Sequence, residues 1–192
     1  MRGLSSRGGA RPGRLTLGGI LLLLAWAALA GAFSVTSVVT RQEGNLYLMD
    51  ARIAYRFSEA AMEALDNGVP LTIDVHLQVR QKSAWMWEES LVDRHLRYSI
   101  RYQPLSERYQ VVELPDGAKK SFVSRDAAIA ALGELDGVPL LGRDRIKPGQ
   151  SYEVELRAAL DIEALPLPLR PMAYLKPSWK LSSGWTEWAL QH

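Results

Sequence analysis

The sequence predicts a mainly β protein, an antiparallel sandwich of two sheets with about seven or eight strands and two short helices. Long stretches alternate between apolar and polar residues, tight-turn signals separate them, and only two segments start with a helix-capping serine. Successive side chains of a strand point to opposite faces, so a period of two indicates a half-buried strand. A single antiparallel sheet with both helices on one face is the alternative architecture.

The most regular alternation lies in residues 71–114, which we interpret as three antiparallel strands at 71–80, 92–102 and 109–114. If the first two pair as a hairpin, one register places His76 opposite His95 and Asp74 opposite Arg97. Registers shifted by two residues keep the same faces, so these pairings remain candidates.

Further strands are expected at 33–40, 47–57, 118–123, 150–162 and, with a bulge near Gly184, at 179–190. The proline-rich segment 165–171 is expected to be extended and to cross between the sheets, because proline cannot donate within a central strand.

Two helices complete the prediction. Ser58 is a suitable N-cap for a helix over 59–67, which the Asn67-Gly68 pair ends. Ser124 caps a second helix with an apolar stripe that reaches Leu135, and Gly137 ends it.

Residues 1–32 are typical of an export segment, either a cleaved signal peptide or an uncleaved anchor in the inner membrane. The apolar run 15–33 follows four basic residues, and small residues at 28–32 offer cleavage sites; the basic residues are Arg2, Arg7, Arg11 and Arg14. A run of this length can also span a bilayer. Both alternatives place the single domain 33–192 outside the cytoplasm, in the periplasm.

Composition excludes several classes of function. The whole chain has 23 Lys+Arg and 21 Asp+Glu, but residues 1–32 hold four arginines and no acidic residue. The remainder, with 19 basic and 21 acidic residues, has no basic excess for binding nucleic acid. Because there is no cysteine, disulfides, thiolate metal sites and cysteine catalysis are excluded.

Four segments carry a resemblance to a known family: residues 97–109, 121–132, 165–171 and 179–188. The last two read Leu-Pro-Leu-Pro-Leu-Arg-Pro and Trp-Lys-Leu-Ser-Ser-Gly-Trp-Thr-Glu-Trp. Together they resemble the bacterial family DUF4390, a domain of unknown function. The resemblance implies an exported proteobacterial protein, often encoded beside a membrane histidine kinase of the nitrogen-regulation type. It carries over no catalytic residue.

No motif predicts catalysis, a cofactor or a metal. The chain lacks Gly-x-Ser-x-Gly, Ser-x-x-Lys, His-Glu-x-x-His and phosphate-binding glycine loops, so we predict a protein that is not an enzyme. His76 and His95 form a conceivable zinc pair, but spacing fixes no third ligand and solvated histidines are the commoner case. We therefore predict no metal site.

Partner-binding residues are expected in a loop and on a strand. Trp85, Met86 and Trp87 lie in the loop 81–90, where large apolar residues must bury against something, either a partner or the open end of the sandwich. Arg97 and Arg101 belong to a row of strand arginines that either binds acidic groups or pairs with neighbouring carboxylates.

These observations predict a non-enzymatic module of the cell envelope that binds a membrane protein partner. A sensor histidine kinase is the candidate partner by family association, and contact with the membrane surface is a further expectation. The alternative is a periplasmic carrier that holds a small molecule or a lipid between its sheets.

Overall fold

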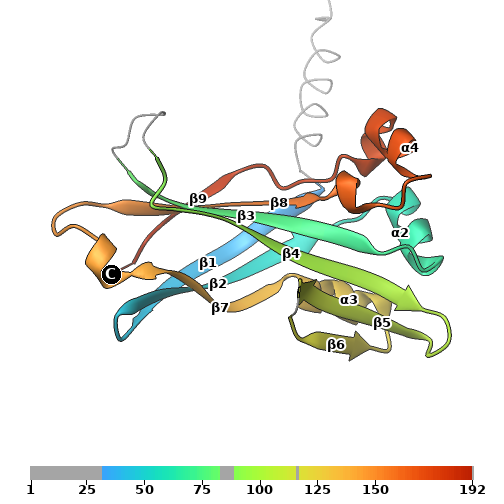
Figure 1. Cartoon of the computed structure of the whole chain (residues 1–192), viewed down its shortest axis with the longest axis horizontal. Helices are drawn as coiled ribbons and strands as arrows, with labels where there is room; N and C mark the ends of the chain where they lie inside the picture. Colours follow the sequence, from blue (N-terminus) through green and yellow to red (C-terminus); the bar gives the residue numbers. More distant parts are fainter. Residues whose placement is uncertain (1–31, 83–88, 116, 192) are drawn as a thin grey trace, which may run out of the picture. The chain divides into compact units, whose positions relative to one another are not determined.

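The computed structural model describes residues 32–82, 89–115 and 117–191. Within this part of the chain the strands form two antiparallel sheets (Figure 1), so the predicted two-sheet sandwich is confirmed. No helix of the described residues is long and apolar enough to cross a membrane.

The smaller sheet has three strands in the order β1-β2-β7. β1 (Phe33–Glu43) and β2 (Leu46–Tyr55) form a hairpin around Gly44, whose φ of 59° suits glycine. β7 (Glu134–Gly142) pairs with the other side of β2 and contains Pro139, which is tolerated because β7 is an edge strand.

The larger sheet has six strands in the order β6-β5-β4-β3-β8-β9, and each neighbouring pair is antiparallel. Its strands are β3 (Leu71–Gln81), β4 (Val92–Gln103), β5 (Arg108–Leu114), β6 (Lys119–Phe122), β8 (Tyr152–Leu160) and β9 (Thr186–Ala189). The long strand β3 lies at the centre, between β4 and β8.

The apolar side chains of both sheets form one hydrophobic core. Every second residue of β3, from Leu71 to Val79, is fully buried, and every second residue of β2, from Tyr47 to Tyr55, belongs to the same cluster. The polar residues that alternate with them on β3 face outward. Burying one side of each sheet is the main source of stability in such a sandwich.

Helices α2 (Glu59–Asp66) and α3 (Arg125–Leu132) begin where the sequence predicted. Ser58 Oγ accepts the Ala61 N–H at 3.3 Å, and Ser124 Oγ accepts the Ala127 N–H at 3.2 Å. α3 contacts strands of both sheets, so it fills one open end of the sandwich, whereas α2 contacts β4 and the turn near Trp179 (Figure 1).

The predicted end of the second helix was wrong. α3 ends at Leu132, and residues 134–142 form β7 instead of continuing the apolar stripe. The reason is tertiary: the backbone N–H of Ile53 donates to the carbonyl oxygen of Gly133 at 2.9 Å, so pairing with β2 replaces the helix.

The predicted extended form of residues 165–171 was also wrong. Leu165 is buried, a turn follows it, and α4 (Arg170–Leu175) then begins. Pro171 lies in the first turn of α4, where its missing N–H costs no helical hydrogen bond. The expected strand at 179–190 is shorter than predicted, because β9 covers only its last part.

Candidate functional site

The outer face of the six-stranded sheet carries a group of polar side chains that interact with one another. β3, β4 and β8 contribute its polar side chains through their period-two alternation. This outer face comprises Asp74, His76, Gln78, Asp93, His95, Arg97, Arg157 and Asp161.

The strand register brings the two histidines together. His76 of β3 lies opposite His95 of β4, and Asp74 lies opposite Arg97, so the candidate register is confirmed. On the other side of β3, His76 lies opposite Arg157 of β8. The imidazole rings of His76 and His95 stack with centroids 4.0 Å apart, and the Trp185 ring lies 4.8 Å from that of His76.

Each histidine hydrogen-bonds a carboxylate of the neighbouring strand. His76 Nε2 lies 2.7 Å from Asp93 Oδ1, and His95 Nδ1 lies 2.9 Å from Asp74 Oδ2. Gln78 Nε2 donates to Asp93 Oδ2 at 2.9 Å. The bond from His76 holds the pKa of the Asp93 carboxyl below its usual range, so Asp93 stays ionised at neutral pH.

The arginines of this face have different partners from those predicted. One alternative from the sequence was that the strand arginines pair with neighbouring carboxylates, but those of Asp74 and Asp93 bind histidines. Arg97 instead forms an ion pair with Asp161, which follows β8. Among the described residues, Arg157 and Arg101 have no ion-pair partner.

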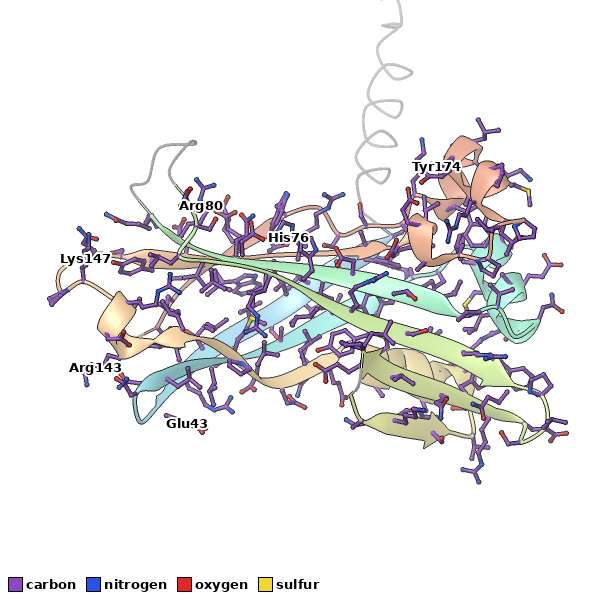
Figure 2. All side chains as sticks on the ribbon, viewed as in Figure 1. Glu43, His76, Arg80, Arg143, Lys147 and Tyr174 are labelled. Atoms are coloured by element: carbon purple, nitrogen blue, oxygen red, sulfur yellow. The ribbon has the colours of Figure 1, made fainter. Side chains whose placement is uncertain are left out.

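A groove of about 580 Å³ runs from the histidines toward α4. Arg97 and Arg157 line it together with the apolar residues Ala159 and Ile162. Tyr174 closes its far end and hydrogen-bonds Glu163 through its hydroxyl. Figure 2 shows His76 and Tyr174 on the same side of the sheet.

A second cavity lies between the sheets, where the carrier alternative would place a ligand. Its volume is about 330 Å³, and residues of β4, β5, β6, β7 and α3 line it. Arg94 lies on this side and donates to the carbonyl oxygen of Pro139 at 2.7 Å. Several charged side chains surround this cavity: Arg94, Glu113, Lys120, Glu134 and Asp136.

Of the predicted partner-binding residues, Arg97 lines the groove and Arg101 is exposed farther along β4. Trp85, Met86 and Trp87 lie outside the described residues, so their prediction stays untested. Two other tryptophans differ in their exposure: Trp179 is buried, whereas Trp185 is exposed beside His76.

Sequence reasoning missed three contributors to this face: Arg157, Tyr174 and Trp185. The alternation in 150–162 put Arg157 on a polar face, but no local signal shows that β8 pairs with β3. That pairing joins segments about 80 residues apart, and strand order of this kind depends on the whole fold.

A family model described as "Domain of unknown function (DUF4390)" matches residues 30–189. The chain belongs to the DUF4390 family. The resemblance drawn from the sequence is thereby confirmed. Comparisons of this DUF4390 chain with curated proteins and with solved structures found no match. The family supplies no activity, so function must be argued from the site.

Proposed function

We propose that this DUF4390 protein is a non-enzymatic module of the cell envelope that binds a membrane protein partner through the outer face of its six-stranded sheet. The observation that carries the proposal is the groove between the histidines and Tyr174. The export segment predicted for residues 1–32, cleaved or retained as an anchor, supports a periplasmic location.

The groove has the chemistry to hold an acidic segment with an apolar side chain. The guanidinium of Arg157 has no ion-pair partner within the described chain, so it is available to bind a carboxylate. Ile162 and Tyr174 offer partly exposed apolar surface beside it. We therefore propose an extracytoplasmic acidic segment of a membrane protein as the occupant, with the neighbouring sensor histidine kinase as the candidate.

The predicted contacts in the loop 81–90 belong to the same proposal. In the sequence, Trp85, Met86 and Trp87 come four to six residues after the end of β3, which supplies His76 and Gln78 to the face. Trp and Met are enriched where proteins recognise one another. If this protein binds one conformational state of the kinase more tightly than the other, it shifts the equilibrium between the two states of the kinase.

The carrier alternative is less well supported. The described inner face of β3 is fully buried by protein side chains, which leaves no room for a lipid chain along it. The cavity between the sheets is near the lower limit for ligand pockets and is lined by charged groups. A lipid that co-purifies with the protein would nevertheless favour the carrier.

Site-specific photocrosslinking in intact cells tests the proposal. A photoreactive phenylalanine replaces Tyr174 at the groove or Val39 on β1, which have similar exposed fractions of 48% and 52%. We expect position 174, but not 39, to crosslink to a membrane protein identified as the kinase. Arg157→Glu and the double variant Trp85→Ala/Trp87→Ala should each reduce that crosslink at least fivefold. Equal crosslinking from both positions, or none, would contradict the proposal.

A further inference from the structure

We infer that His76, His95 and Asp93 form a binding site for a divalent zinc ion on the outer face of the six-stranded sheet. The inference rests on the arrangement of these side chains and does not depend on the proposed partner. It revises the expectation of no metal site, because the structure supplies the third ligand that sequence spacing did not fix.

The three residues are close enough to share one ion. One ligand atom from each lies within 4.8 Å of those of the other two. Tetrahedral zinc with bonds of 2.0–2.1 Å requires its ligand atoms to be about 3.3 Å apart. Small side-chain rotations close the difference, and the exposed His95 and Asp93 have room for them, with 54% and 53% of their side chains accessible.

Neighbouring side chains orient two of the ligands. Asp74 contacts Nδ1 of His95 at 2.9 Å, which leaves Nε2 of that ring for a metal. A carboxylate bound to the distal nitrogen of a zinc-binding histidine fixes the tautomer and raises the basicity of the ligand. Gln78 holds Oδ2 of Asp93 at 2.9 Å and leaves Oδ1, which faces His76 Nε2, for the ion.

The donor set favours zinc over calcium or magnesium. Two imidazoles and one carboxylate suit a borderline-soft ion, whereas the hard cations prefer oxygen ligands alone. Three protein ligands leave the fourth position open to water or to a group from outside. Two carboxylates, Asp74 and Asp93, offset the ion's charge, while Arg157 opposite His76 opposes it, so we expect moderate affinity.

The competing interpretation is a row of surface hydrogen bonds with no ligand. Such exposed pairs contribute little to stability, typically less than about 1 kcal/mol each. Hydrogen bonds of this kind do not by themselves explain why two imidazole rings stack between two carboxylates. A shared cation gives this arrangement a physical reason, and the two interpretations differ in a measurable way.

Calorimetric titration of the full chain, purified in detergent with a tag that contains no histidine, tests the site. We expect saturable one-to-one binding of zinc chloride and no saturable binding of magnesium chloride. His76→Gln, His95→Gln and Asp93→Asn should each weaken zinc binding at least tenfold. Asp74→Asn, which removes only the orienting contact, should weaken it between about tenfold and a hundredfold.

Asp136→Asn is the matched control, because Asp136 is an exposed carboxylate that pairs with Arg52 at 2.7 Å on the other sheet. Its zinc affinity should equal that of the wild type. Zinc should also raise the unfolding temperature of the wild type and of this control, but not of His95→Gln. Absence of saturable zinc binding to folded wild type, or unchanged affinity in both histidine variants, would overturn the assignment.

Discussion

A Cβ atom on Gly133 would lie 2.0 Å from the carbonyl oxygen of Ile53. This close approach is where α3 ends and β7 begins, and it places the helix against β2. The contact involves two backbones, so no flexible side chain can move aside. Gly133 is therefore required by space and not by its backbone angles, since its φ is −84°.

Gly133→Ala should destabilise the protein by at least about 2 kcal/mol, because β2 and α3 must separate to accept the methyl group. The midpoint of urea unfolding measures the change. Gly149→Ala is the control: its φ is 75° but no atom lies within 4 Å of the added Cβ. The control should lose about 1 kcal/mol from backbone strain alone. Equal losses would show that the Ile53 contact does not matter.

Asp50 should make stability depend on acid pH. Arg41 forms an ion pair with it, and the Gly137 N–H donates to Oδ1 at 2.6 Å. Both interactions lower the pKa of the Asp50 carboxyl in the folded state, and the hydrogen bond from Arg41 has the larger effect. The unfolded chain then binds more protons at low pH, so this contribution is complete above about pH 5 and is lost as the pH falls through the folded pKa.

Asp50→Asn should therefore lower the unfolding temperature at pH 7 by a few degrees. Below about pH 3 the unfolding temperatures of wild type and variant should differ by less than they do at pH 7. Thermal unfolding followed by circular dichroism across this range measures both effects. The asparagine keeps an acceptor for the Gly137 N–H, so the test isolates the charge. A difference that is constant across pH would contradict the assignment.

The strand pattern of β3 and β4 was predictable because it depends on local alternation. Apolar residues such as Ile73 and Ile100 face the core as expected, and both helix starts are at the predicted serines. Two strands joined by one loop have few possible registers, which is why the pairing of His76 with His95 could be proposed.

The rest depends on contacts between distant segments. Gly137 marks an end of the helix in the sequence, but nothing local shows that it ends before Leu135, and the bond between Ile53 and Gly133 decides this. Likewise the outer face becomes a site only when β8 brings Arg157 beside His76 and the chain after it brings Asp161 to Arg97. Sequence periodicity assigns faces to strands, but it does not order the strands in a sheet.

Leu156 tests whether the sandwich interior is as well packed as its burial indicates. This residue of β8 is fully buried and lies opposite Leu77 of β3. Leu156→Ala should cost about 2–5 kcal/mol, through lost burial and the cavity that remains. Leu105→Ala, at a fully exposed position, should change the free energy of unfolding by less than about 0.5 kcal/mol. A loss below about 1 kcal/mol at Leu156 would indicate a loosely packed interior and would strengthen the carrier alternative.

Tyr55 offers a substitution that should stabilise the protein. Its hydroxyl is buried and has no hydrogen-bond partner among the described residues, although its ring packs edge-on against Phe33 with centroids 4.8 Å apart. A buried hydroxyl without a partner loses its hydrogen bonds to water and gains none in return. Tyr55→Phe removes that cost and keeps the ring contact.

We expect Tyr55→Phe to raise the free energy of unfolding by about 1 kcal/mol in urea titrations. Tyr109→Phe is the matched control, because the Tyr109 hydroxyl donates to Asp66 Oδ1 at 2.9 Å. That variant should lose up to about 1 kcal/mol, since the same atom is removed from a satisfied bond. Because the two substitutions delete the same atom, the opposite signs isolate the effect of hydrogen bonding. Destabilisation by Tyr55→Phe as large as that of the control would show that the Tyr55 hydroxyl has a partner in the folded protein.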